Sequence, residues 1–362
     1  MATNSRNLGI GFGDVQHFHD GLGEFSRQFG LHLANRAPEL SERLGVRVHY
    51  HLPERFHGMF GNQIGYLPVT KNQRHWHNPG IQFDVWHNLH QLIRQRPPLG
   101  TRHCITTLHD LNMVYTKQGF SRWRALRKQI RLLRRADEII CISDHVLGDL
   151  RSHTSLHTPA TRIYNGVHPL NDTLQEPIIE LADQAYLFNI GRMTPNKNIG
   201  VLIELAAAWP EQIFVFAGPY TGYTKGYRDQ AQARRLSNVR FYFDVTEGQK
   251  AWLYAHCQGL LFPSIAEGFG LPPIEAMHFG RPVFLSRCTS LPEIGGPVAR
   301  FFDDYTPAEM RRIIQLTMAS DQHDNRHDEI QAWASRFSWP TCMAQYLDRY
   351  QQALVPAAVS AR

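Results

Sequence analysis

Glu267 and Glu275 stand eight residues apart in the segment EGFGLPPIEAMHFGRPV, with Gly268, Gly270 and the pair Pro272-Pro273 between them. Glycine lets bare backbone N–H groups come close to a ligand, and carboxylates accept hydrogen bonds from vicinal hydroxyls. The segment therefore predicts a rigid loop that grips two polyols across an anion. A nucleotide sugar has this layout, because its diphosphate lies between a ribose and a sugar.

The run GLLFPS before this segment is typical of a buried strand, so the loop is expected at the carboxyl end of that strand. Pro273 suits the first turn of a helix over IEAMHF, which Gly280 and Pro282 would end. Glu275 would then lie in the first turn, where the helix dipole stabilises an anion. Phe269 is expected to be exposed.

A basic pair follows another expected strand, AYLFNI. Arg192 comes directly after Gly191, and Lys197 follows five residues later, before the helical run NIGVLIELAAAW. The guanidinium fork and the ammonium charge both suit phosphate oxygens, and a helix N-terminus favours an anion. In isolation, such a pair is more often a solvated surface feature. Its place after a strand favours an anion site.

Two sets of strands must position these loops. The apolar runs alternate with helix-length segments: NLGIGFG, VRVHYHL, IQFDVWH, HCITTLH and EIICIS, then AYLFNIG, IFVFAG, VRFYF, GLLFPS and PVFLS. This pattern predicts an α/β protein with two doubly wound parallel sheets. We expect an N-terminal domain over 1–168, a linker over 169–180, a C-terminal domain over 181–340, and a closing helix and tail over 341–362.

The composition agrees with a two-domain globular protein. A chain of 362 residues is long for one core, and its hydrophobic share of 43% argues against disorder. Five scattered cysteines without a C-x-x-C, no secretion leader and no membrane-spanning apolar run indicate a cytoplasmic protein. The net charge of +6 indicates an anionic partner, although mild basicity can also serve only solubility.

The E-x7-E segment, with GR…KN before it and SLPEIGG after it, resembles the retaining glycosyltransferases of family 4. GLGEF, TLHD, EIICISDHV and FSWPTCMAQYL extend the resemblance over most of the chain. The resemblance includes the mannosyltransferase branch. It implies two Rossmann-like domains that face each other across a cleft (the GT-B fold), with the C-terminal helix returning toward the N-terminal domain.

The resemblance also implies roles for individual residues. Arg192 and Lys197 would neutralise the donor diphosphate, Glu275 would hold the ribose, and Glu267 would hold the transferred sugar. The remaining donor contacts would come from Gly21, Gly23, Gly268, Phe269, Gly270 and Leu271. His109 would lie near the outer hydroxyls of the sugar, so the catalytic set is His109, Arg192, Lys197 and Glu267. His17, His19 and Asp110 are candidate acceptor contacts, and Asp110 can instead order its loop.

The implied reaction moves a hexose from a nucleotide sugar with retention, and it needs no cofactor. The chain contains no D-x-D, so no metal is expected, and fixed cations would stabilise the departing diphosphate. GDP-mannose is the first donor expected, with UDP-glucose or a UDP-GlcNAc-type donor as alternatives. The expected acceptor is a cell-envelope glycan or a lipid-linked glycan. A non-catalytic binding protein with the same fold stays open.

The segment SRWRALRKQIRLLRRA, residues 121–136, carries seven Arg or Lys residues and an apolar stripe formed by Trp123, Leu126, Ile130 and Leu133. We expect the stripe to pack on the sheet. Contact of the charges with an anionic membrane surface, on the inner face of the cytoplasmic membrane, is the alternative.

Three other classes of function are disfavoured. His17/His19, His49/His51 and His75/His77 have H-x-H spacing but lack further ligands at the spacing of a structural metal site. The chain has no nucleic-acid-binding motif, so no nucleic acid is expected as a partner. It also lacks the G-x-G-x-x-G of dinucleotide oxidoreductases.

Overall fold

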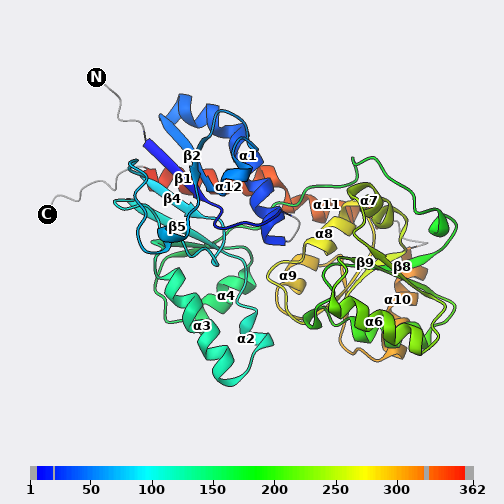
Figure 1. Cartoon of the computed structure of the whole chain (residues 1–362). Helices are drawn as coiled ribbons and strands as arrows, with labels where there is room; N and C mark the ends of the chain where they lie inside the picture. Colours follow the sequence, from blue (N-terminus) through cyan, green and yellow to red (C-terminus); the bar gives the residue numbers. More distant parts are fainter. Residues whose placement is uncertain (1–5, 19–20, 322–325, 355–362) are drawn as a thin grey trace. The chain divides into compact units, whose positions relative to one another are not determined.

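The chain forms two units, each built on its own parallel sheet (Figure 1). The computed structural model describes residues 6–18, 21–321 and 326–354. One unit comprises Met1–Gly166 and Trp339–Arg362, and the other comprises Val167–Ser338. The chain therefore crosses between units after Gly166 and after Ser338, and the segment 169–180, where a linker is expected, falls inside the second unit.

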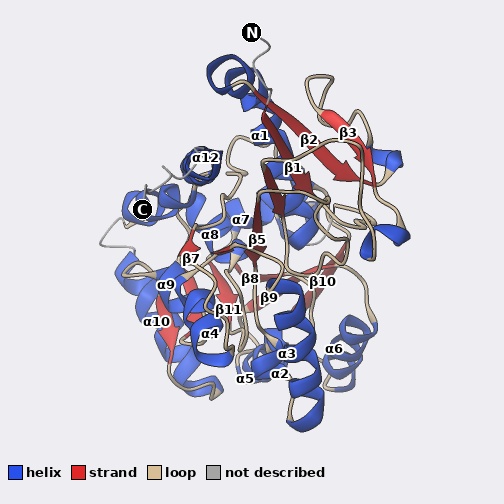
Figure 2. Ribbon diagram, turned by 90° about the vertical axis from the view of Figure 1, so that its left-hand side faces the viewer, coloured by secondary structure: helices blue, strands red, loops and turns tan. Residues whose placement is uncertain are grey.

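The first unit contains a seven-stranded sheet in the order β3-β2-β1-β4-β5-β6-β7, with every neighbouring pair parallel. Figure 2 shows β1, β2 and β3 side by side at one edge. The order reverses between β1 and β4, as in a doubly wound fold. The strands are β1 (Arg6–Gly11), β2 (Val46–Leu52), β3 (Gly65–Pro68), β4 (Val85–Asn88), β5 (His103–Leu108), β6 (Glu138–Cys141) and β7 (Ala160–Arg162).

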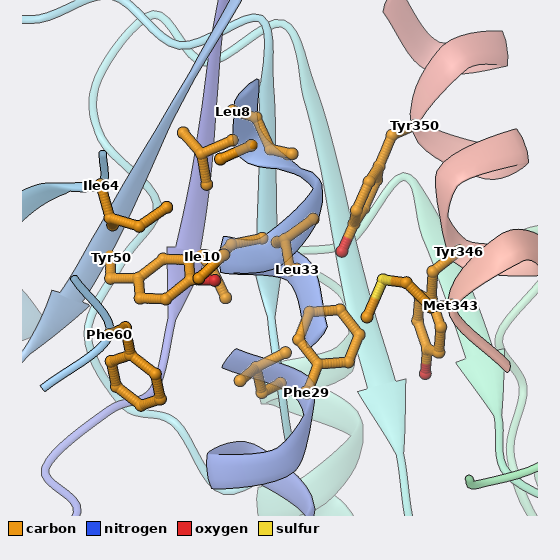
Figure 3. Packing of buried hydrophobic residues seen from close by; sticks show 14 of the residues in the cluster. Leu8, Ile10, Phe29, Leu33, Tyr50, Phe60, Ile64, Met343, Tyr346 and Tyr350 are labelled. Atoms are coloured by element: carbon orange, nitrogen blue, oxygen red, sulfur yellow. The ribbon is translucent and has the colours of Figure 1, made fainter. Parts of the chain in front are cut away.

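Helices cover this sheet, and one of them comes from the far end of the chain. They are α1 (Gly21–Leu44), α2 (Met113–Thr116), α3 (Gly119–Leu133), α4 (Asp144–His153) and α12 (Trp339–Leu354). Figure 3 shows Met343 and Tyr346 of α12 pointing toward Phe29 of α1, within one buried apolar cluster. The expected return of the C-terminal helix to the N-terminal domain is confirmed.

Polar contacts anchor α12 as well as apolar ones. The Tyr350 hydroxyl lies 2.5 Å from His87 Nδ1, and the Tyr346 hydroxyl lies 3.0 Å from Thr107 Oγ1. His87 Nε2 contacts the same threonine oxygen at 2.8 Å. Because buried polar groups cost free energy without partners, this network favours a single packing position of α12 against β4 and β5.

The second unit contains a six-stranded parallel sheet in the order β10-β9-β8-β11-β12-β13. Its strands are β8 (Tyr186–Ile190), β9 (Ile213–Gly218), β10 (Val239–Phe243), β11 (Gly259–Phe262), β12 (Val283–Ser286) and β13 (Arg300–Phe302). Its helices are α5 (Ile199–Ala208), α6 (Gly222–Ala233), α7 (Glu247–His256), α8 (Leu271–His278), α9 (Leu291–Gly295), α10 (Pro307–Asp321) and α11 (His327–Ala334).

The ten strands predicted from apolar runs are all present, and the prediction of two doubly wound sheets is confirmed. Three strands escaped prediction, namely β3, β7 and β13. Each has three or four residues and only β13 contains a fully buried one. Each also lies at a sheet edge. A short, half-exposed strand leaves no apolar run to detect.

The basic helix α3 corrects the expectation that its whole apolar stripe packs on the sheet. Leu133 is fully buried and Leu126 and Ile130 are half-buried, but Trp123 is 50% exposed. Trp123 stacks on Phe120, which is 72% exposed, with 5.3 Å between ring centroids. The C-terminal half of α3 is thus anchored in the unit, whereas its N-terminal half presents aromatic rings to solvent.

Candidate functional site

The two loops singled out in the sequence meet in the second unit. They follow β8 and β11, which are neighbours in the sheet. The backbone N–H of Ile265 donates to the carbonyl oxygen of Asn196 at 2.8 Å, and Asn196 Nδ2 donates to the Ala266 carbonyl oxygen at 3.0 Å. These bonds hold the basic loop and the glycine loop against each other.

Lys197 and Glu267 form an ion pair at this junction. Lys197 Nζ lies 2.5 Å from Glu267 Oε1, and the two side chains are only 19% and 13% exposed. The ammonium also lies 5.0 Å from the centre of the Phe262 ring, as in a cation–π contact. The pair is thus fixed before any ligand arrives, and a bound anion would share the lysine with the carboxylate.

Arg192 offers a second cation close in sequence to the first. Its side chain is exposed, and no carboxylate in the described residues pairs with it. The preceding Gly191 has φ of +136°, and its carbonyl oxygen would clash with any Cβ at Gly218. Glycine is therefore required where β8 and β9 end, and Arg192 follows that tight turn with its guanidinium in solvent.

Two neighbouring hydroxyl groups hold the backbone of the EGFG loop through hydrogen bonds. The Ser290 hydroxyl donates to the Phe269 carbonyl oxygen at 2.6 Å, and Thr289 Oγ1 accepts from the Glu267 N–H at 3.0 Å. Phe269 is buried and packs edge-on against Phe337, so the expectation of an exposed Phe269 was wrong. Its ring fixes the loop, and Gly270, with φ of +123°, turns the chain into α8.

Glu275 lies in the second turn of α8, and its expected place in the first turn was wrong. The helix begins at Leu271 because Pro272 and Pro273 fit its first turn, where N–H groups need no partner. The carboxylate is held by side chains of α7. Tyr254 donates its hydroxyl to Oε2 at 2.6 Å, and Lys250 Nζ lies 3.3 Å from Oε1.

His109 lies in the first unit and is locked in place. Its Nε2 lies 2.9 Å from the Leu89 carbonyl oxygen, which can only accept, so Nε2 carries the proton. The ring meets Phe25 edge-on at 4.6 Å. Burial lowers the pKa of His109 to about 3, so the imidazole is neutral at physiological pH. With Nε2 protonated, Nδ1 is the acceptor nitrogen of the neutral ring.

The other N-terminal candidates differ in what surrounds them. Asp110 Oδ1 accepts from the Asn112 N–H at 2.9 Å, a contact that orders the loop. A Cβ at Gly23 would lie 2.8 Å from the His17 carbonyl oxygen, so this glycine permits close packing of a loop on α1. Gly21 and His17 are exposed, and His19 lies outside the described residues.

Comparisons with known proteins identify the family. The family model for Glycosyl transferases group 1 matches residues 172–331, and the model for Glycosyltransferase Family 4 matches residues 26–169. The chain belongs to family 4 of the glycosyltransferases. The family resemblance of the EGFG segment and its companion motifs is therefore confirmed.

Relatives of this glycosyltransferase include mannosyltransferases of Escherichia coli. The O-antigen chain mannosyltransferase B is 28% identical over 279 residues, which cover 70% of this chain and 71% of that protein. The serotype-specific mannosyltransferase WbdA is 26% identical over 243 residues. That match covers 61% of this chain but 29% of WbdA, so the chain spans under a third of that relative.

Solved structures show that this glycosyltransferase has the GT-B fold of two Rossmann-like domains. Sucrose-phosphate synthase from Thermosynechococcus elongatus matches with a TM-score of 0.71 at 19% identity, over 96% of this chain and 98% of that chain. The Anabaena protein HepE in complex with UDP-glucose matches with a TM-score of 0.71 at 18% identity, over 96% and 99% of the two chains. At such identities the likeness concerns the fold alone.

Sequence reasoning missed several polar groups that build the site of this glycosyltransferase. Ser290 and Thr289 support the glycine loop, and Ser290 opens the SLPEIGG motif, so that motif could have indicated it. Lys250 and Tyr254 flank Glu275 from α7, and no local pattern points to them. Asn196 lies between the two basic residues and could have been considered with them.

The described residues of this glycosyltransferase contain no group of three or more His, Cys, Asp or Glu that could hold a metal ion. His51 and His77, from two of the H-x-H pairs, stack at 4.7 Å in the core, and burial lowers the pKa of His51 to about 3. No helix in this part of the chain is long and apolar enough to cross a membrane.

Proposed function

We propose that this glycosyltransferase moves a mannosyl residue from GDP-mannose to a cell-envelope glycan or lipid-linked acceptor, with retention and without a metal ion. The observation that carries the proposal is the pre-formed site of the second unit, where Arg192, Lys197, Glu267 and Glu275 follow adjacent strands or flank their loops. The mannosyltransferase relatives, two of them named for O-antigen, support the sugar and the acceptor class.

In the proposed reaction, the bond between the sugar C1 and the diphosphate oxygen breaks, and a bond from C1 to the acceptor oxygen forms on the same face. The departing phosphate accepts the acceptor's proton. Lys197 and Arg192 stabilise the negative charge that grows on the diphosphate, which is an electrostatic contribution that needs no metal. Because Lys197 is already paired and half-buried, it is oriented before the donor binds.

Within the proposed site, Glu275 holds the ribose and Glu267 holds the transferred sugar. Tyr254 holds one oxygen of Glu275 and Lys250 contacts the other, so the carboxylate is oriented before the ribose binds. Glu267 is oriented in the same way, because Lys197 contacts one of its oxygens. The two carboxylates therefore act on hydroxyls, and no glycosidase-type nucleophile is invoked.

Exchanging each glutamate for glutamine separates these roles. Glu275→Gln is expected to weaken GDP binding by ~10–100-fold, since a charged hydrogen bond contributes ~1.5–3 kcal/mol. Glu267→Gln should leave GDP binding nearly unchanged but impair transfer. Calorimetry with GDP and initial rates with GDP-mannose measure both effects. Glu247→Gln on α7, which is 70% exposed and contacts Lys250, is the matched control. If calorimetry showed that Glu267→Gln weakens GDP binding and Glu275→Gln does not, the proposed orientation of the donor would be reversed.

UDP-glucose or a UDP-GlcNAc-type donor is the second candidate. The structurally similar HepE was solved in complex with UDP-glucose, which supports this alternative. A thermal-shift screen with GDP, UDP, ADP and TDP sugars decides between donors, because a ligand at 100 times its Kd adds ~2.7 kcal/mol to stability. Transfer and hydrolysis assays with the same panel separate an enzyme from a non-catalytic binding protein of this fold.

We also propose that α3 contacts an anionic membrane surface. Its exposed Phe120 and Trp123 extend a helix whose Arg and Lys side chains face solvent, as in helices that lie at a membrane interface. Arg127 stacks its guanidinium 4.7 Å from the centre of the Trp123 ring, which places charge and aromatic surface together. This surface would bring the enzyme to a lipid-linked acceptor.

Replacing Arg124, Lys128 and Arg131 with Ser should weaken binding to anionic vesicles by ~1 kcal/mol per charge. Added salt should weaken the native chain's binding in the same way, because the attraction is screened over ~8–10 Å. Transfer to a water-soluble acceptor should not change. Vesicle co-sedimentation measures the binding, and a triple Ser variant at three exposed basic residues of the same unit, Arg47, Lys71 and Arg151, is the control. Equal loss in both variants would contradict a specific role for α3.

A further inference from the structure

A pocket of about 350 Å³ lies within the first unit and is lined by residues of that unit alone. It is formed by the segment 14–17, the first turns of α1, Arg74 and the segment 90–95. Its lining contains the ionisable side chains of Asp14, His17, Arg74, His90 and Arg94. The lining therefore carries two guanidinium groups against one carboxylate.

Arg74 enters this pocket from a rigid support. It ends the 3-10 helix Lys71–Arg74, which is closed by a capping box between Thr70 and Gln73. Its Nε is buried without a hydrogen-bond partner, and no carboxylate of the described residues pairs with its guanidinium. A buried donor without a hydrogen-bond partner costs free energy. A bound anion would remove that cost.

The rest of the lining reinforces the same charge preference. Arg94 also forms no ion pair within the described residues. Leu22 and Gly23 belong to the first turn of the 24-residue helix α1, whose N-terminus carries a partial positive charge. The one carboxylate of the lining, Asp14, is exposed and accepts from Gln16 Nε2 at 3.2 Å, so it is available to sugar hydroxyls at the rim.

Gln91 ties the pocket to the histidine loop and to α3. Its side-chain oxygen accepts from the His109 N–H at 3.0 Å, and its side-chain nitrogen lies 3.3 Å from the Asp110 carbonyl oxygen. Its own carbonyl oxygen accepts from Gln129 of α3 at 2.9 Å. The pocket segment 90–95 is thus held between the loop that is expected to contact the sugar and the helix that is proposed above to contact lipid.

We propose that this pocket binds an anionic group of the acceptor, with Arg74 and Arg94 as its ligands and Asp14 and His17 on neighbouring hydroxyls. This inference rests on the proposed function, because it names the acceptor chemistry for the same reaction. The anion is a phosphate or diphosphate ester, as in a lipid-linked glycan, or the carboxylate of an acidic sugar. The second unit has its own cations, Arg192 and Lys197, for the donor diphosphate.

The test measures binding directly in the full-length chain. Lys197→Ala is introduced first to weaken binding of the probes at the donor site, and calorimetric titrations use inorganic pyrophosphate and, separately, methyl glucuronide. Arg74→Gln in this background should weaken binding of the preferred probe by ~10–100-fold, as expected for one charged contact. Arg96→Gln removes the same charge from an exposed residue outside the lining, and it should change binding less than about twofold.

Tighter pyrophosphate binding identifies a diphosphate-bearing acceptor, and tighter glucuronide binding identifies an acidic sugar. The proposal is overturned if neither probe binds or if Arg74→Gln binds both as its parent does, with circular dichroism verifying the fold. It is also overturned if Arg74→Gln alone weakens GDP binding, because the pocket would then serve the donor. Pocket binding in a chain that transfers no sugar would refute the proposed function and leave the anion site standing.

Discussion

Lys197→Ala is expected to lower kcat by ~10²–10³-fold while the chain keeps its fold, the loss typical of removing one charge-stabilising group. Among the described residues of the second unit, Lys197 is the only cation that pairs with Glu267. Its Nζ lies 2.5 Å from Glu267 Oε1. Without Lys197, the negative charge on the departing diphosphate would be unscreened from the unpaired carboxylate of Glu267. Initial rates at saturating GDP-mannose measure the effect. Near-normal turnover would remove Lys197 from the mechanism.

Two further variants separate the role of the lysine from the cost of leaving Glu267 unpaired. Lys225→Ala removes an exposed lysine that pairs with Asp229 on α6, and it should leave kcat unchanged. The double variant Lys197→Ala, Glu267→Gln removes the unpaired carboxylate. Because Glu267→Gln alone is expected to impair transfer, the double variant is compared with that single variant. If adding Lys197→Ala to Glu267→Gln lowered kcat no further, the lysine would be a structural partner only.

The free energy of unfolding of the first unit is expected to fall by about 4 kcal/mol between pH 7.0 and pH 5.5. Burial is the largest cause that lowers the pKa of three of its histidines, His51, His87 and His109, each to about 3. The unfolded chain takes up protons below its histidine pKa of about 6.5, while the folded chain does not. Stability is therefore fully present above pH 6.5 and is lost toward pH 3, at ~1.4 kcal/mol per pH unit for each histidine.

Denaturant unfolding at pH 7.0 and 5.5 checks this expectation in a range where most carboxylates stay ionised. His51→Asn should reduce the pH dependence by about one third, because it removes one of the three groups. His75→Asn, at an exposed position of the same unit, controls for the substitution itself. A free energy of unfolding that stays level from pH 7.0 to 5.5 would contradict the buried, neutral state of these rings.

The amino-acid sequence by itself determined the two parallel sheets and the strands that the two candidate loops follow. Long apolar runs such as Tyr186–Ile190 are buried on both faces of a parallel sheet, so they stand out without knowledge of their neighbours. Loops that follow such runs lie at the carboxyl edge of a sheet, which placed Arg192 and Glu267 correctly in the same unit. The glycine-rich segment also carries the family resemblance by itself, because its motif is local in the sequence.

Only the tertiary structure decided how the side chains meet. Lys197 and Glu267 are 70 residues apart, and their contact depends on β8 and β11 being neighbours, which no local pattern encodes. The partners of Glu275 come from α7, and the start of α8 at Leu271 moved that carboxylate out of the first turn. Helical periodicity marked the stripe of α3 but could not tell which end the sheet would cover. Burial is a property of the neighbouring elements, and a helix carries the same apolar spacing whether they reach it or stop halfway.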